Sequence, residues 1–360
     1  MSSNGNPCIL YGELYTKYKS EIISEVISKT NIEKNKLKHS KQNDVIIPCS
    51  GETAVDIAVA RCVPFDNVLL GGDLNIIRLH KYDGAFMAYQ LNSKRKIEIA
   101  KLAQGVSVVH LYGENLKSIN TFNPSLQEQQ KIVRLLSLLD ERIKVQNKII
   151  EDLKKLKSAI SKHLFARKDL LETTICLSNI ATLKNGYAFQ SGKYNALGKW
   201  KILTITNVSG ERYINDEDYN CIINLPNDIQ DHQVLKEGDI LISLTGNVGR
   251  VSLCKDGDYL LNQRVGLLQL AKNVNQEFLY QILSSQRFEN SMIACGQGAA
   301  QMNIGKGDVE SYVLPYSSNV NNILLVAKIL HSYDEYIINE QRKLTLLTMQ
   351  KQYFLAQMFI

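Results

Sequence analysis

The order of apolar and polar residues divides this chain into two similar halves, offset by about 194 residues. In each half, short runs rich in Val, Ile and Leu are separated by glycine and other turn residues, a pattern that predicts β-strands. A stretch of about 40 residues with apolar side chains at helical spacing follows each of these segments. The pattern therefore predicts one structural unit used twice, a β-rich segment followed by a long helix.

The two stretches with helical spacing cover residues 125–165 and 319–359. Pro124 and Ser125, with Glu128 three residues later, are typical of an N-cap and capping box and predict where the first helix begins. Each helix has a heptad row interrupted by one lysine: Leu136, Ile143, Ile150, Lys157 and Leu164, and then Leu330, Ile337, Leu344, Lys351 and Met358. Two such rows in one chain predict a helix pair. Since the second β-rich segment directly follows the first helix, we expect the helices to pack antiparallel.

The apolar faces of these helices are wider than a two-helix seam requires. Surplus apolar surface on an exposed helix pair commonly binds another protein. The residues that we predict to contact such a partner are Leu135, Leu136, Ile149, Leu156, Leu330 and Ile337.

Shorter helical stretches lie within the two halves, over residues 86–102 and 277–292. Together the patterns predict an α+β fold, with two β-rich domains in tandem, each built on a twisted, mostly antiparallel sheet and followed by a long helix. The predicted boundaries are 1–123 for the first domain, 124–168 for its helix, 169–317 for the second domain and 318–360 for the second helix. We expect the first domain to be short at its N-terminal side, because the first copy has no counterpart of residues 184–189.

The composition fits a globular protein, because 44% of the 360 residues are hydrophobic and 22% are charged. No apolar run reaches the roughly 18 residues of a membrane span and no secretory signal is readable, so we expect a cytoplasmic protein without a membrane partner. The seven cysteines are scattered and form no C-x-x-C pair, which indicates reduced thiols. The net charge of +6 is concentrated in the first long helix and its exit. Such a basic helix is most often a solvated face, and the alternative is attraction to a polyanion such as nucleic acid.

Motifs for catalysis or metal binding are missing from the sequence. It has no P-loop, no dinucleotide-binding glycine motif, no methyltransferase [N/D]-P-P-[Y/F] tetrapeptide, and no H-E-x-x-H or G-x-S-x-G. The six histidines are dispersed. We therefore predict a binding protein that carries no catalytic residue, metal or cofactor of its own.

The β-rich domains contain side chains suited to reading double-stranded DNA. Asn and Gln pair with adenine and Arg with guanine, and glycine-flanked loops expose backbone N–H groups to phosphates. Taken singly, Asn and Gly are ordinary turn residues, and a lysine run is often only solvated. The predicted DNA-binding residues are Lys184, Asn185, Tyr187, Asn247, Arg250, Asn262, Gln263, Arg264, Gln301 and Asn303 in the second domain, and Lys36, Lys38 and Lys41 in the first.

Over nearly its whole length the chain resembles the specificity (S) subunits of type I restriction–modification systems. The resemblance is carried by NPSLQEQQKI at 123–132, by LSLLD at 136–140 and its counterpart around residues 330–334, and by the duplication itself. In addition, KNGYAF at 184–189 resembles the entry loop of a target-recognition domain, and residues 297–304 resemble the closing motif of that domain.

The resemblance implies that each β-rich domain reads one half of a bipartite DNA target and that the helix pair sets the spacer between the halves. It also implies that two modification methyltransferase subunits, which bind S-adenosylmethionine and methylate adenine, dock on the chain, and that restriction/translocase subunits can join them. We therefore expect a non-catalytic recognition subunit. The residues alone leave two alternatives: a helical interaction scaffold with protein-binding β domains, and an enzyme with an unrecognised site, such as a nuclease.

Overall fold

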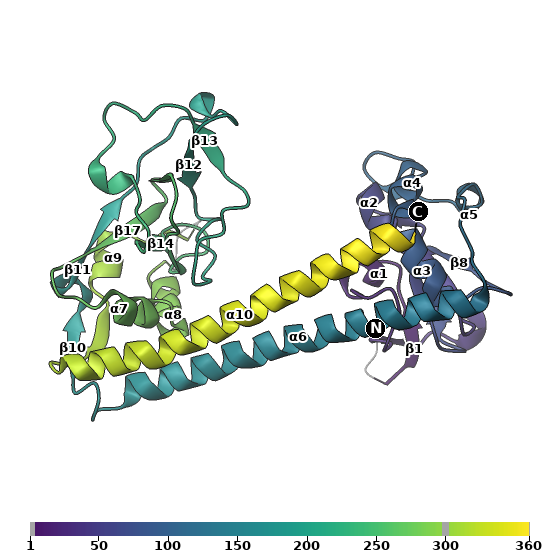
Figure 1. Ribbon diagram of the computed structural model, residues 1–360, viewed down its shortest axis with the longest axis horizontal. Coiled ribbons are helices and arrows are strands. Elements are labelled where there is room, and N and C mark those ends of the chain that lie inside the picture. The colour runs from purple at the N-terminus through teal and green to yellow at the C-terminus, as the bar shows by residue number, and fades with distance from the viewer. Residues whose placement is uncertain (1–3, 297–301, 360) are drawn as a thin grey trace. The chain divides into compact units, whose positions relative to one another are not determined.

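A computed structural model describes residues 4–296 and 302–359 of the chain. It divides into two compact units, the first formed by residues 1–148 and 341–360 and the second by residues 149–340. Two long helices, α6 (Leu126–Ala166) and α10 (Val320–Met358), each contribute one end to each unit (Figure 1). Each unit therefore contains one β-rich domain and a short length of the helix pair.

The main sheet of the second unit has four antiparallel strands. Their spatial order is β11 (Ala181–Asn185), β17 (Val265–Leu270), β14 (Ile240–Ser243) and β15 (Val251–Leu253). A second sheet has the order β13 (Asn220–Ile222), β12 (Trp200–Leu203) and β16 (Tyr259–Leu261), with β12 and β16 parallel. The remaining elements are β10 (Thr173–Cys176) paired with β18 (Val313–Tyr316), helices α7 (Gln276–Leu283), α8 (Gln286–Cys295) and α9 (Lys306–Glu310), and 3-10 turns η2 (Leu177–Asn179), η3 (Ser191–Lys193) and η4 (Asp231–Gln233).

Strand β14 is buried on both faces, which explains its uninterrupted apolar run. Ile240 and Ile242 pack into a core that includes Phe278 of α7, whereas Leu241 points to the other face and packs with Leu203 of β12. The alternation of side chains along a strand thus places the α-helices on one face of the main sheet and the second sheet on the other.

The first unit repeats this plan, with one strand fewer in its main sheet and one more in its second sheet. Its main sheet has the order β6 (Arg61–Val63), β4 (Asp44–Pro48) and β8 (Leu74–Ile77), and its second sheet the order β2 (Ser28–Thr30), β1 (Asn6–Ile9), β7 (Leu69–Leu70) and β3 (Lys38–His39). The other elements are β5 (Ser50–Gly51) paired with β9 (Val109–His110), helices α1 (Glu13–Thr16), α2 (Ala54–Ile57), α3 (Gly84–Asn92), α4 (Arg95–Lys101) and α5 (Gly113–Leu116), and the turn η1 (Lys34–Lys36). Each domain thus has a second sheet in addition to its main sheet, where the sequence pattern predicted a single sheet.

Strand β11 has no counterpart in the described part of the first unit, so β8 lies at the edge of its sheet whereas β17 is paired on both sides. The absent strand belongs to the segment that has no counterpart in the first copy when the two halves of the sequence are aligned. The other strands of the two main sheets correspond: β4 with β14, β6 with β15 and β8 with β17.

The two long helices are antiparallel, as the sequence predicted. In the first unit Lys351 of α10 pairs with Asp140 of α6, and in the second unit Asp334 of α10 pairs with Lys157 of α6. In the direction in which residue numbers rise along α6, they therefore fall along α10. The predicted cap is present at the start of α6, where the Glu128 backbone N–H donates to Ser125 Oγ at 3.4 Å. No helix in residues 4–296 and 302–359 has both the length and the apolarity needed to cross a bilayer.

Candidate nucleic-acid interface

Several predicted DNA-binding residues lie at one end of the main sheet of the second unit. Asn185, the last residue of β11, pairs with Gly266 near the start of β17, and Ser243, the last residue of β14, pairs with Val265. Because β11 and β14 end where β17 and β15 begin, residues 186–190, 244–250 and 262–264 all leave the sheet at the same end. We call this end the loop end of the second unit.

Backbone contacts hold the first of these segments against the turn before β17. Tyr187 N–H donates to the Leu261 carbonyl at 2.8 Å, and Gln263 N–H donates to the Tyr187 carbonyl at 3.0 Å. The approach is so close that a Cβ on Gly186 would lie 2.2 Å from the Asn262 carbonyl oxygen. A glycine is therefore required in KNGY because of backbone contact and not merely because the chain turns.

The loop after β14 links the other two segments. Leu244 N–H donates to the Arg264 carbonyl at 3.0 Å, and its own carbonyl accepts from Ile304 N–H at 2.9 Å. Gly246 N–H donates to the Met302 carbonyl at 3.0 Å. The chain after residue 301 thus returns to the same loop end, although it is about 60 residues away in sequence.

The predicted residues that the structure brings together come from four segments and present mostly amide and guanidinium groups. They are Asn185, Tyr187, Asn247, Asn262, Gln263, Arg264 and Asn303. All of them except Tyr187 and Asn262, which are half-buried, are exposed. Groups of this kind, held on a rigid backbone frame, can donate to and accept from base edges in a DNA groove.

The other three predicted residues of the second domain, Lys184, Arg250 and Gln301, are not part of this group. Lys184 lies one residue further inside the sheet and lines a separate hollow with Asp231 and Gln276. Arg250 lies near the loop end, but its Nε is 3.6 Å from Glu289 Oε1, so its charge is partly neutralised. Gln301 lies outside the described residues.

The predicted lysines of the first unit are not gathered at one place. Lys38 is paired with Leu70 of β7, close to the turn into β8 and thus near the corresponding loop end. The Lys41 backbone N–H instead donates to the Asp44 carboxylate at the opposite end of β4, at 2.8 Å. Lys36 is exposed and forms an ion pair with the exposed Glu33, with 3.0 Å between Nζ and Oε2.

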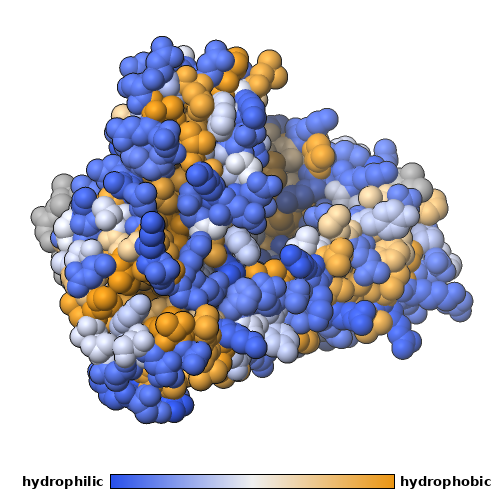
Figure 2. Space-filling model, turned by 60° about the vertical axis from the view of Figure 1, so that its left-hand side comes forward, coloured by the Kyte–Doolittle hydropathy of each residue, from blue (hydrophilic) through white to orange (hydrophobic). Residues whose placement is uncertain are grey.

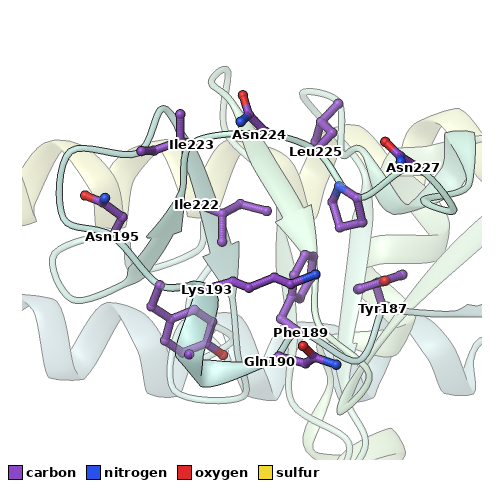
Figure 3. Close-up of a pocket in the computed structure, with 13 residues that line it drawn as sticks. Tyr187, Phe189, Gln190, Lys193, Asn195, Ile222, Ile223, Asn224, Leu225 and Asn227 are labelled. Carbon is purple, nitrogen blue, oxygen red and sulfur yellow. The ribbon is translucent and has the colours of Figure 1, made fainter.

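A hollow of about 460 Å³ beside Tyr187 adds residues that the sequence did not single out. In Figure 3, Asn195, Asn224 and Asn227 stand around its edge, and Phe189 and Ile222 lie nearer its middle. The chain also contributes Gln190 and Lys193 to this hollow. The KNGYAF stretch at 184–189 marked one side of this hollow in the sequence, but no motif marked the loop after β13, which forms the other side.

Tyr187 connects the hollow with the loop end. Its ring centroid is 4.9 Å from that of Phe189, and its hydroxyl donates to Asp228 at 2.8 Å. This hydrogen bond raises the pKa of Tyr187 above its ordinary value, because the carboxylate accepts the phenol proton's hydrogen bond and favours the protonated form. On the face of the second unit shown in Figure 2, hydrophobic residues form separate groups between hydrophilic ones.

The predicted partner surface on the helices is narrower than the sequence indicated. Leu136, Leu330 and Ile337 are buried within this chain, so they offer no side-chain surface to another protein. Leu135, Ile149 and Leu156 remain 38%, 40% and 47% exposed. Heptad position separates the two groups, because the first three lie on the inner row of the helix pair.

Comparison with known family models and curated proteins finds the same family in both cases. The model of the type I restriction modification DNA specificity domain matches residues 2–155 and again residues 172–349. A curated relative, the type I restriction enzyme MjaVIII specificity subunit of Methanocaldococcus jannaschii, is 26% identical over 307 residues, which cover 78% of this chain and 69% of the relative.

Two solved structures have the same fold. The S subunit of a type I restriction-modification system from M. genitalium has a TM-score of 0.59 and 19% identity, covering 99% of this chain and 92% of that one. A chain from a study of complex assembly and conformational transition of the type I R-M system has a TM-score of 0.55 and 16% identity, covering 89% and 83%.

Proposed function

Because this chain belongs to the family of type I restriction–modification DNA specificity domains and carries two copies of the domain, we propose that its two units bind the two halves of a bipartite double-stranded DNA target. The family and the curated relative are specificity subunits, so the chain recognises DNA and catalysis belongs to other subunits. The question is then which surface reads the bases.

The gathering of amide and guanidinium side chains at the loop end of the second unit supports this proposal most directly. Arg264 is exposed next to Gln263, and Asn303 reaches the same surface from a distant segment. Arg pairs bidentately with guanine, and Asn and Gln with adenine. The loop end of the second unit would read one half-site in this way, and the corresponding end of the first unit, near Lys38, the other.

The helix pair would serve as the spacer and as the platform for catalytic subunits. We propose that two modification methyltransferase subunits dock on it, with Leu135, Ile149 and Leu156 as apolar contacts, and that restriction/translocase subunits can join. S-adenosylmethionine would then bind to the methyltransferase subunits, which methylate adenine, and not to this chain.

The test is DNA binding by the full chain, co-expressed with the genes that neighbour its own. We expect the methyltransferase to co-purify, and the affinity for a duplex containing the target to fall steeply with salt, because bound phosphates release counterions. Failure to recover a methyltransferase would contradict the partner proposal. A flat salt response would favour a helical interaction scaffold with protein-binding β domains.

One substitution tests the reading surface. Arg264→Ala should weaken binding to the cognate duplex by about 1–3 kcal/mol and relax the sequence preference at one position. Lys272→Ala is the matched control, because Lys272 is an exposed cation just beyond the opposite end of β17. Equal effects of the two variants in fluorescence anisotropy would rule out the loop end as the reading surface.

A further inference from the structure

Each unit contains a largely buried lysine–aspartate pair between the long helices. In the second unit, Lys157 Nζ of α6 lies 2.5 Å from Asp334 Oδ1 of α10, with side chains 18% and 7% exposed. In the first unit the roles of the helices are exchanged: Lys351 Nζ of α10 lies 2.6 Å from Asp140 Oδ1 of α6. The repeat in the sequence places Lys157 on Lys351 and Asp140 on Asp334, so the two pairs are equivalent.

A single register of the helices satisfies both pairs. From Asp140 to Lys157, α6 advances by 17 residues, and from Lys351 to Asp334, α10 goes back by the same number. If one helix slid along the other by one turn, both lysines and both aspartates would lose their partners at once. The Leu and Ile side chains of the same rows would lose less by such a shift, because one apolar side chain can pack in the place of another.

The second unit connects its pair to the recognition domain through Arg212. This buried guanidinium donates to Asp334 Oδ2 at 2.9 Å and to both carboxylate oxygens of Glu277 in α7, at 2.9 and 2.6 Å. Gln281 Nε2 also donates to Asp334 Oδ2, at 2.6 Å. The Lys157 ammonium lies 6.0 Å from the centroid of the Tyr280 ring.

The first unit makes the equivalent connection with the opposite charge. Glu21 Oε2 lies 2.6 Å from Lys351 Nζ, and the Tyr89 hydroxyl donates to Asp140 Oδ2 at 2.6 Å. The Lys351 ammonium lies 5.5 Å from the centroid of the Tyr89 ring, just as Lys157 lies near Tyr280. Burial would lower the pKa of Lys351, but Glu21 and Asp140 outweigh it and raise the pKa, so this lysine stays charged.

Glu21 and Arg212 occupy the same position in the fold. The Glu21 carbonyl accepts from Cys62 N–H of β6 at 2.8 Å, and the Arg212 carbonyl accepts from Leu253 N–H of β15 at 2.7 Å. As β6 and β15 are equivalent strands, each recognition domain reaches its helix pair from one backbone position. The first domain supplies an anion there and the second a cation.

Stability alone does not explain such networks. Removing several charges from water costs free energy, and well-packed apolar residues in the same place are often as stable or more stable. What buried charged groups can add is a unique arrangement, because every alternative leaves a charge buried without a partner.

We propose that the Lys157–Asp334 and Lys351–Asp140 pairs are positioning residues that hold the two helices in one register, and that Arg212 and Glu21 attach the recognition domains to this register. The register in turn fixes the DNA spacer, a consequence that rests on the proposed function.

Charge reversal in the first unit tests the pairing without DNA. Asp140→Lys and Lys351→Asp, each alone, should shift the unfolding equilibrium of the chain by about a hundredfold or more, because each leaves like charges buried together. The double variant D140K/K351D leaves Glu21 against an aspartate, so the triple variant E21K/D140K/K351D should recover part of the loss. Recovery is incomplete because the buried Arg61 guanidinium, which interacts favourably with Glu21 and Asp140, then faces two lysines. Urea denaturation measures this. A triple variant no more stable than the double would overturn the pairing.

Apolar replacement tests the register. In E21Q/D140L/K157M/D334L/K351M we expect a folded chain whose complex with the methyltransferase methylates sites with more than one spacer length. Lys154→Met is the control and should keep the wild-type spacer. It replaces an exposed lysine of α6 that pairs with Glu211 of the second domain. A single unchanged spacer in the apolar variant would overturn the register role.

Failure of the proposed function and failure of the register proposal give different results. If the wild-type complex methylates no bipartite site, the proposed function fails, and the charge-reversal series still decides the pairing. If the apolar variant does not fold, that series again decides, because the triple variant keeps both salt bridges of residue 351, with Glu21 and with Asp140, in reversed polarity.

Discussion

Gly186 lies directly after β11, where the backbone of Asn262 leaves no room for a Cβ. The Gly186→Ala variant should destabilise the chain by about 1–3 kcal/mol, since either the loop or the turn before β17 must move. DNA binding should weaken in parallel, because Tyr187 and Gln263 are positioned by this contact. Chemical denaturation and anisotropy measure the two effects.

Gly192→Ala is the matched control for Gly186→Ala. It lies in the same loop, and a Cβ there would meet nothing within 4 Å. The control should leave stability within experimental error of the wild type. Equal stability of the two variants would contradict the close backbone approach.

Glu277 gives a prediction of pH dependence. Burial by itself would raise its pKa, but hydrogen bonds from Arg212 and Gln281 and the charges of Arg212 and His331 outweigh burial, so the pKa lies below its ordinary value of 4.5. Such a carboxylate stabilises the folded state above pH 4.5, and this contribution is lost as the pH falls through the lowered pKa.

The free energy of unfolding should therefore fall more steeply on acidification in the wild type than in Glu277→Gln. Urea denaturation at several values between about pH 3 and pH 6 measures both slopes. Parallel curves for the two proteins would show that Glu277 titrates alike in the folded and unfolded chain.

At the scale of elements, the start of α6 is held by Gln129 as well as by Ser125. The Gln129 side chain is buried, donates to the Pro124 carbonyl at 2.8 Å and accepts from Asp83 N–H of the α3 cap at 2.9 Å. It thus ties the first turn of the long helix to the recognition domain, which the sequence motif alone did not reveal.

Gln129→Ala removes the partner of two partly buried groups, the Asp83 N–H and the Pro124 carbonyl, and should cost about 1–3 kcal/mol of stability. Gln130→Ala is the control, because Gln130 is exposed at the next position of the same helix. Thermal unfolding monitored by circular dichroism measures the difference. If the two variants melt together, Gln129 does not anchor the helix.

At the scale of the whole molecule, helix length should determine the DNA spacer. We predict that one heptad inserted after Ile150 and another at the facing position, after Gln341, lengthens the spacer by at most about three base pairs and leaves the half-site sequences unchanged. A heptad keeps the apolar rows and both lysine–aspartate pairs on the inner face. Mapping methylated sites of the reconstituted complex measures the spacer, and an unchanged spacer would refute the ruler role.

Local sequence patterns determined the elements. Heptad spacing predicted both helices, and the Pro124–Ser125 cap predicted the start of the first, because helix formation and capping depend on residues within a few positions of one another. The repeat predicted two equivalent domains for the same reason, since similar local patterns fold alike. The residue types suited to DNA, such as Arg264 and Asn303, were also visible in the sequence.

Only the tertiary structure decided which of these residues meet. Arg264 and Asn303 share a loop end because strand pairing joins segments far apart in sequence. Lys38 and Lys41, although close in sequence, lie at opposite ends of the first domain, because Lys38 belongs to β3 and Lys41 precedes β4. The lysine in each heptad row appeared to interrupt the seam, yet it finds its aspartate across the helix pair. Such pairings depend on distances in space, and a one-dimensional pattern does not contain them.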